Sequence, residues 1–178
     1  MKKIALISDT HGRLDERILG ILFEEEPDLI IHAGDICGSS VLQELANVAP
    51  VIAVLGNNDF DEYGADVQLF AHPVVDGVRF LVGHIPRDVQ IGFNGCRALS
   101  AGDLIPDVIV HGHTHVPRLE YGPAARPAQF IVNPGSAFRP RSEFGRTIGF
   151  IEVDAGAVKD IRIVDLDGKA VLKWPEEA

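Results

Sequence analysis

In the first third of the chain, short apolar runs alternate with segments whose apolar residues recur at helical spacing. The runs predict strands over residues 3–8, 28–32 and 51–55. The helical spacing predicts one helix over residues 13–25 and another around residues 41–46, with Ser39 or Ser40 as its N-cap. Repeated strand–helix units join parallel strands by right-handed crossovers. This part of the sequence therefore predicts a parallel sheet.

The remainder of the chain contains more predicted strands than helices. Asp76-Gly77 lies between the apolar runs 74–76 and 78–82, which is typical of a tight hairpin. A helix is expected over about residues 93–101. Further strands are expected over residues 108–111, 118–121, 129–132, 147–153, 158–164 and 170–173. So many strands favour two sheets with helices outside them, and the sequence has no repeat or linker that would divide residues 1–178 into more than one domain.

Composition and charge narrow the range of functions. A chain of 178 residues can bury about 70% of the surface of its unfolded form. A net charge of −10 argues against an extended nucleic-acid surface, which needs clustered lysine and arginine. No apolar run approaches the ~18 residues of a membrane-spanning helix, and the short run after Lys3 is expected to be a strand rather than a signal peptide. A cytoplasmic protein is therefore expected, with Cys37 and Cys96 as reduced thiols.

Five short motifs contain most of the side chains that bind metals in proteins. They are Asp9-Thr10-His11-Gly12, Gly34-Asp35, Gly56-Asn57-Asn58-Asp59, Gly83-His84 and His111-Gly112-His113-Thr114-His115. All but the fourth directly follow a predicted strand, and His84 lies one glycine beyond its strand. Loops at the carboxyl ends of parallel strands border a single crevice. Residues far apart in the sequence are therefore expected to meet at one site.

The spacing within the motifs is consistent with metal binding. Asp9 and His11 are two residues apart, as are His113 and His115, so each pair points to one side of an extended segment. Carboxylate, amide and imidazole ligands together suit Mn, Fe, Zn or Ni better than Ca. Each of the first four motifs taken alone is more often a turn or a structural feature. Three histidines within five residues, in a chain that has seven, indicate a metal site more strongly.

Together and in this order, the motifs resemble those of the calcineurin-like metallophosphoesterases. The compact length and the segment Asn133-Pro134-Gly135-Ser136 resemble the small prokaryotic YfcE-like phosphodiesterases in particular. The resemblance implies an α/β fold, a four-layer α/β/β/α sandwich of two mixed sheets flanked by helices. It also implies a phosphoesterase that acts on phosphodiesters more readily than on monoesters.

Carried over residue by residue, the resemblance implies a site for two divalent ions, with Mn expected and Ni, Fe or Zn as alternatives. One ion would be held by Asp9, His11 and His115, the other by Asn57, His84 and His113, with Asp35 bridging the two. A hydroxide that bridges the ions would be the nucleophile of an in-line displacement, the ions lying ~3.5–4 Å apart. The residues expected to contribute to catalysis are Asp35, Asn57, Asn58 and His111.

Two positions depart from the family pattern. Many members have a histidine after the metal-binding asparagine, where it assists the leaving group. This chain has Asn58, which cannot supply a proton at a useful pKa, so water or a nearby histidine would have to do so. Relatives also have His-Gly-His where this chain has Gly83-His84-Ile85, and His84 is the single histidine of that segment.

Other polar residues are candidates for supporting roles. His32 and His111 either orient ligands or substrate, or are packed histidines at strand ends. Asp59 is expected to support the Asn57 loop or His11. Three arginines either contact an anionic substrate or are solvated at the surface, namely Arg13, Arg139 and Arg141.

Two rival functions are less consistent with the sequence. The retromer subunit of this fold is thought to be a protein-binding scaffold that has lost parts of its site, whereas this chain keeps a metal-binding side chain at every candidate position. A metallo-β-lactamase-type hydrolase would need His-x-His-x-Asp-His, but Val116 follows His115. The expected partner is a small phosphoester, and cyclic nucleotides, nucleotide diesters and RNA ends all stay open. A homodimer is also open, because relatives often form dimers.

Overall fold

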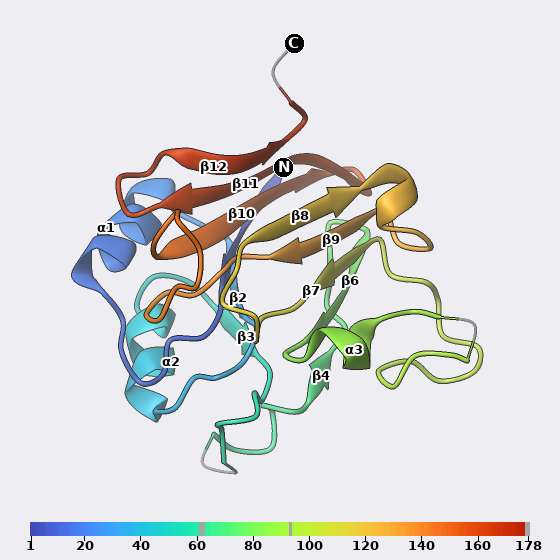
Figure 1. Ribbon diagram of the computed structural model, residues 1–178, viewed down its shortest axis with the longest axis horizontal. Coiled ribbons are helices and arrows are strands. Elements are labelled where there is room, and N and C mark those ends of the chain that lie inside the picture. Colours follow the sequence, from blue (N-terminus) through green and yellow to red (C-terminus); the bar gives the residue numbers. More distant parts are fainter. Residues whose placement is uncertain (61–62, 93, 177–178) are drawn as a thin grey trace.

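The computed structural model describes residues 1–60, 63–92 and 94–176, and its strands form two six-stranded sheets (Figure 1). The first sheet has the order β12 (Ala170–Trp174), β11 (Ala157–Asp165), β10 (Thr147–Asp154), β1 (Lys2–Ile7), β2 (Leu29–His32) and β3 (Val51–Ala53). The second has the order β4 (Phe70–Ala71), β6 (Val78–Gly83), β7 (Val108–Val110), β9 (Phe130–Asn133) and β8 (Arg118–Tyr121), with β5 (Val74–Val75) also paired to β6.

Both sheets are mixed. In the first, β1, β2 and β3 are parallel, as the strand–helix alternation predicts, while β10, β11 and β12 add antiparallel strands on the other side of β1. In the second, β6, β7 and β9 are parallel and β4 and β8 run antiparallel at the edges. The Asp76-Gly77 hairpin is confirmed, since Val75 pairs with Val78 across it.

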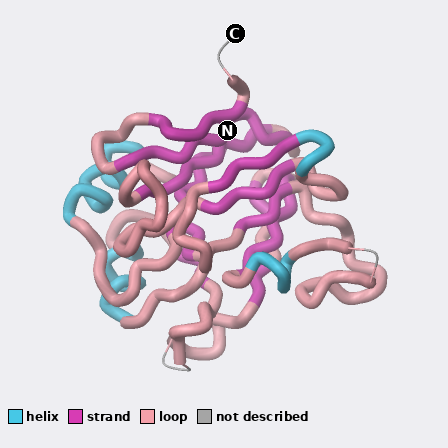
Figure 2. Tube along the Cα trace, in the orientation of Figure 1, coloured by secondary structure: helices cyan, strands magenta, loops and turns pink. Residues whose placement is uncertain are grey.

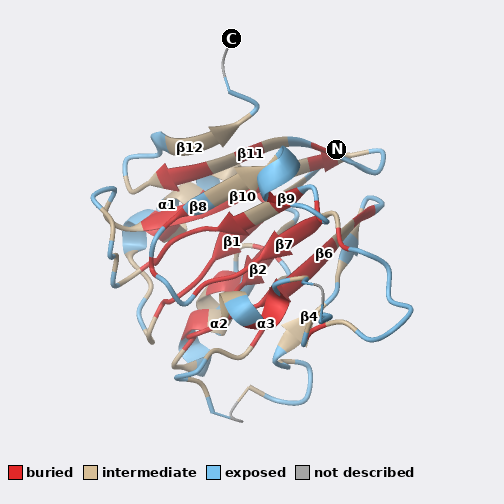
Figure 3. Ribbon diagram, turned by 45° about the vertical axis from the view of Figure 1, so that its right-hand side comes forward, coloured by how far each residue is buried: buried red, intermediate tan, exposed pale blue. Residues whose placement is uncertain are grey.

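The sheets pack face to face, and helices cover the outer face of the first sheet (Figures 1 and 2). Ile4 and Leu6 of β1 point into the intersheet core, where they meet Val82 and other residues of the second sheet. Ala5 and Ile7 point the opposite way, toward α1 (Glu16–Glu25) and α2 (Ser39–Ala46). Consecutive residues of the central strands β1, β2, β6 and β7 are buried, so these strands are covered on both faces (Figure 3).

The outermost layer beside the second sheet differs from the expectation in detail. It contains the one-turn helix α3 (Pro86–Val89) and the long loop that follows it. The helix predicted over residues 93–101 is wrong for the part that the structure describes, residues 94–101, and Phe93 lies outside the described residues. Gly92 and Gly95 exchange two backbone hydrogen bonds, and this tight loop is incompatible with a helix there. The fold is still the predicted α/β sandwich of two mixed sheets.

Among the described residues, no helix has the length and apolar character needed to cross a bilayer.

The 3-10 turn η1 (Gly122–Ala124) follows β8.

Helix α1 begins later than predicted because Asp15 is its N-cap. The Asp15 carboxylate accepts a hydrogen bond from the backbone N–H of Arg17, so the helix starts at residue 16 rather than 13. The helix ends at Glu25, after which Glu26 takes a left-handed conformation before Pro27. At this end, the Glu25 carboxylate accepts hydrogen bonds from Arg162 of β11, at 2.8 and 2.7 Å, and from Lys3 of β1 at 2.8 Å.

These contacts give a prediction about stability and pH. The hydrogen bonds of Arg162, opposed by burial and aided by Lys3, lower the pKa of Glu25 from 4.5 to about 2. A lowered pKa in the folded state stabilises the protein above pH 4.5, and that contribution disappears as the pH falls toward 2. We expect Glu25→Gln to lower the free energy of unfolding by about 2 kcal/mol at pH 7, after allowance for partial exposure. Urea titrations should show this difference shrinking steadily below pH 4.5. Glu24→Gln, an exposed neighbour on the same helix, should change little at either pH.

Candidate metal centre

The loops that carry the five motifs meet at the carboxyl ends of the parallel strands. Asp9 and His11 follow β1, and Asp35 follows β2. The backbone ties these two loops together, since the N–H groups of Asp9 and His11 donate to the carbonyls of Gly34 and Asp35, each at 3.0 Å. The loop after β7 is held to the loop after β6 in the same way, through Gly112 N–H and the His84 carbonyl at 3.0 Å. The His113 N–H also donates to Oδ2 of Asp9, at 3.1 Å, so motifs from both sheets share one site.

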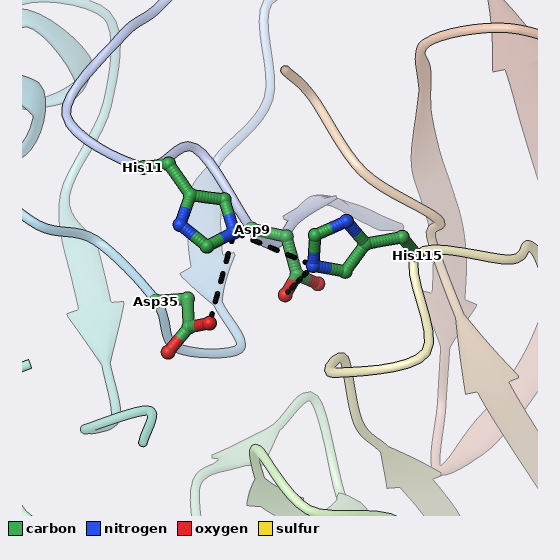
Figure 4. A group of neighbouring side chains, drawn as sticks. All are labelled: Asp9, His11, Asp35 and His115. Atoms are coloured by element: carbon green, nitrogen blue, oxygen red, sulfur yellow. Dashed lines mark hydrogen bonds and ion pairs between the residues drawn. The ribbon is translucent and has the colours of Figure 1, made fainter. Parts of the chain in front are cut away.

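Four side chains form a compact cluster of possible metal ligands, drawn in Figure 4. Asp9, His11, Asp35 and His115 each offer an atom that lies within 4.8 Å of the others. Nε2 of His115 is 3.1 Å from Oδ1 of Asp9 and 3.3 Å from Nε2 of His11. Nε2 of His11 is 3.7 Å from Oδ2 of Asp35. Three of the four side chains are buried, so the cluster is largely shielded from solvent.

Hydrogen bonds around the cluster fix which atoms face inward. Nδ1 of His115 contacts the Arg139 carbonyl at 2.5 Å, and Nδ1 of His84 contacts the Ala33 carbonyl at 2.8 Å. A carbonyl can only accept, so each Nδ1 carries the proton and each Nε2 presents a lone pair to the site. Oδ2 of Asp9 accepts from the Ser8 hydroxyl and from the His113 N–H, at 2.7 and 3.1 Å. Its Oδ1, like Nε2 of His84, is buried without a hydrogen-bond partner.

Acceptor atoms that converge without a donor repel one another unless a cation lies among them. The unpartnered atoms of Asp9 and His84 therefore fit the ligand set of a divalent ion, and protonation is the competing way to relieve them. Burial raises the pKa of Asp9. Burial disfavours the charged form of His84, but the carboxylates of Asp35 and Asp9 outweigh it, so the pKa of His84 lies above its ordinary value.

A second group of candidate ligands adjoins the first. Nδ1 of His113 lies 2.8 Å from Oδ1 of Asn57, and the rings of His113 and His84 are 5.3 Å apart between centroids. Oδ1 of Asp35 is 3.4 Å from Nε2 of His84, while its Oδ2 faces His11. The Asp35 carboxylate thus lies between the two groups, with one oxygen toward each.

Asn58 holds that carboxylate in place. Its side-chain amide donates to Oδ2 of Asp35 at 2.7 Å, and its backbone N–H donates to Oδ1 at 2.9 Å. Burial opposes ionisation of Asp35, but contacts with His84 and these hydrogen bonds overcome it and keep the pKa of Asp35 well below its usual range. In the sequence, Asn58 marked the absence of a proton donor. In the structure, it orients the Asp35 carboxylate.

The ligand loops have strained backbones. Positive φ angles occur at five candidate ligands, Asp9, His11, Asp35, His113 and His115, with values from 46° to 70°. Residues other than glycine rarely adopt this conformation, and such residues cluster at functional sites where the surrounding structure maintains them. The local backbone is therefore arranged to place these side chains.

Two further segments brace the site. Ser136 donates to the Asp9 carbonyl at 2.9 Å, and Asn133 donates to the Gly112 carbonyl at 3.0 Å, so the Asn-Pro-Gly-Ser segment joins the first and last ligand loops. Asp59 accepts from the N–H groups of Gly56 and Cys37, each at 2.7 Å, and so connects the Asn57 loop to the loop of Asp35.

The site opens into a pocket of about 390 Å³. Its lining consists of His11, Asp35, Asn57, Asn58, His113, His115, Arg139, Pro140 and Arg141. Arg139 and Arg141, for which the sequence left a surface role open, therefore border the candidate ligands. Arg13 instead stacks on Phe138, with 5.3 Å between its guanidinium carbon and the ring centroid.

Two histidines named as supporting candidates do not line this pocket. His32 is fully buried and contacts the Thr10 hydroxyl at 3.0 Å, and burial lowers its pKa to about 4. His111 lines a different cavity, and burial lowers its pKa to about 4 as well. The structure thus separates His111 from the other residues that the sequence assigned to catalysis.

Residues 1–156 match the model of the calcineurin-like phosphoesterase superfamily domain. The chain belongs to this superfamily. A probable metallophosphoesterase of Mycoplasma genitalium is 30% identical to this chain over 143 residues, which are 80% of this chain and 82% of the relative. A phosphodiesterase of Methanocaldococcus jannaschii is 29% identical over 127 residues, or 64% of this chain and 73% of the relative.

Solved structures agree with this assignment. The phosphoesterase YfcE of E. coli has a TM-score of 0.71 and 25% identity, with 96% of this chain and 97% of that one covered. Vps29 of Entamoeba histolytica, solved with zinc, has a TM-score of 0.70 and 18% identity, with 96% of each chain covered. The second likeness shows the fold alone, and the first supports the superfamily's phosphoesterase character.

Proposed function

We propose that the chain is a divalent-metal-dependent phosphodiesterase that acts on small phosphoesters in the cytoplasm. The observation that carries this proposal is the convergence of carboxylate and imidazole groups, among which Oδ1 of Asp9 and Nε2 of His84 are buried without a hydrogen-bond partner. A metallophosphoesterase family and a relative named as a phosphodiesterase add to it.

The proposed site holds two ions. Asp9, His11 and His115 would bind one, and Asn57, His84 and His113 would bind the other. Asp35 would serve both, since its two oxygens face different groups of ligands. Mn suits this mixture of oxygen and nitrogen ligands, with Ni, Fe or Zn as alternatives. Bound divalent ions supply a hydroxide nucleophile from water near neutral pH and stabilise charge on phosphoryl oxygens.

The protein's own side chains account for substrate binding. Arg139 and Arg141 line the same pocket as the candidate ligands, and a guanidinium binds phosphate oxygens through paired hydrogen bonds. Because the ligand set is complete, we favour this enzymatic function over a scaffold with the same fold.

Metal dependence tests the proposal. The purified protein, loaded with Mn or Ni, should hydrolyse bis-p-nitrophenyl phosphate, and complete chelation should abolish turnover and lower the melting temperature, because the metal stabilises the folded state. Addition of either metal should restore both properties. Undiminished hydrolysis by fully metal-free protein would overturn the mechanism.

The leaving group gives a separate prediction. Asn58 cannot donate a proton to the leaving group, and its side-chain amide is already hydrogen-bonded to Asp35. We therefore expect kcat to fall steeply as the leaving group becomes more basic, from p-nitrophenyl to phenyl diesters. Asn58→His should flatten this dependence, because an imidazole can donate a proton. A series of aryl diesters provides the measurement, and equal slopes for the two proteins would contradict the assignment.

A further inference from the structure

A second cavity lies against the outer face of the second sheet, beside α3. Its volume is about 180 Å³. Ile109 and His111 alternate with Val110 along the β7 segment, so these two side chains point away from the intersheet core that Val110 enters. Among the described residues, none that lines this cavity also lines the metal pocket.

His111 provides the polar feature of this cavity. Its side chain is only 1% exposed, and Nδ1 contacts the Gly112 carbonyl at 3.1 Å. The Asn133 side-chain nitrogen also lies 3.3 Å from Nδ1, but its two protons are donated to the Gly112 carbonyl and the Thr114 hydroxyl, at 3.0 and 2.9 Å. Nδ1 therefore carries the ring proton, which leaves Nε2 as an acceptor. The structure gives Nε2 no hydrogen-bond partner within the described part of the chain. A buried acceptor without a partner destabilises the fold, so a donor from outside the chain would be bound favourably at this atom.

The walls restrict what can supply that donor. Val89, Ile91, Ile109 and Ile131 form an apolar part of the lining against which a ring can pack, while Gln90, Glu120 and Arg126 also border the cavity. Arg118 is also present, but its guanidinium already donates to Glu120 at 2.9 and 2.7 Å. Apolar cavities of about 150 Å³ accept benzene, so this cavity is large enough for one ring with a substituent. A water is the competing donor, and a ring differs from it by also packing against the apolar side chains.

We propose that this cavity is a second ligand site, which binds a small single-ring molecule bearing an O–H or N–H donor directed at Nε2 of His111. Binding there needs no metal. Two segments of the lining are nevertheless close in sequence to candidate metal ligands. Helix α3 begins two residues after His84, and His111 lies two residues before His113. An occupant would rest on both segments.

Phenol and anisole separate the contribution of the hydroxyl donor to binding from that of the ring. Both molecules contain the ring, and anisole lacks the hydroxyl proton. We expect phenol, titrated into the ¹⁵N-labelled full chain, to shift amide resonances of α3 and of residues 109–111 and 131. Anisole should bind at least tenfold more weakly. His111→Leu should reduce phenol binding to the level of anisole. Ala124→Phe should abolish binding of both, because Ala124 is an exposed residue of the lining whose enlargement would block the cavity.

Ala124→Phe keeps the test decisive if His111→Leu fails to fold, because the substituted side chain is at the surface. Equal affinity for the two probes would overturn the proposal. So would the absence of shifts in these segments, shifts that persist unchanged in Ala124→Phe, or a crystal soaked in phenol that shows only ordered water in the cavity.

Discussion

Asp35→Asn is expected to lower kcat/KM for bis-p-nitrophenyl phosphate by more than ~100-fold, since loss of groups that merely orient metal ligands already costs ~10–100-fold. Asp35 lies between the two proposed ion sites, with Oδ2 at 3.7 Å from Nε2 of His11 and Oδ1 at 3.4 Å from Nε2 of His84. An amide at this position removes a negative charge and places an N–H group beside the Asn58 amide or one of the histidines. Steady-state kinetics with Mn-loaded protein measures the loss.

Two controls separate this loss from misfolding. Asp66→Asn makes the same chemical change at an exposed position and should leave kcat/KM unchanged. The metal-free Asp35→Asn protein should keep a cooperative melting transition, at a lower temperature than the metal-free parent, because Asn58 and His84 stabilise the ionised Asp35 carboxylate in the folded state. Added Mn should then stabilise the parent and stabilise the variant far less. Retained activity together with normal metal stabilisation would remove Asp35 from the proposed centre.

The parts of the fold that follow from local sequence rules were predictable. β1, β2 and β3 are short apolar strands separated by amphipathic helices, and this alternation dictates a parallel sheet. The helix expected over residues 93–101 failed for a different reason. Ile91, Cys96 and Leu99 pack against the second sheet, so their apolar spacing reflects burial, while the Gly92–Gly95 loop determines the backbone. Apolar spacing alone does not distinguish a helix from a loop that covers a sheet.

The candidate site shows a similar division. The motifs indicated which loops would meet, because strand ends fix their position. They did not indicate that Asn58 orients Asp35, which depends on a hydrogen bond between residues 23 positions apart. The direction of the His111 side chain could be predicted from the alternation of side chains along Val108-Ile109-Val110-His111. This alternation places His111 on the same face of the sheet as Ile109.

Gly56→Ala is expected to destabilise the protein by about 3 kcal/mol and to weaken metal binding, because the new methyl group has no space. A Cβ at Gly56 would lie 2.2 Å from both the backbone nitrogen and Oδ1 of Asp35. No real Cβ contact is so short, and the backbone nitrogen cannot move aside as the end of a flexible side chain can. The Asp35 loop or the Asn57 loop must therefore shift, and either shift separates ligands of the proposed centre.

Gly20→Ala is the matched control, because it makes the same change where a Cβ would meet nothing within 4 Å. Gly20 is exposed within α1, and alanine favours a helix over glycine by roughly 0.5–1 kcal/mol, so this variant should be more stable than the parent. Thermal melting and Mn titration calorimetry of both variants should give opposite signs for stability and a loss of Mn affinity in Gly56→Ala alone. If Gly56→Ala melted and bound Mn like the parent, the close packing of the two ligand loops would not control the position of Asp35.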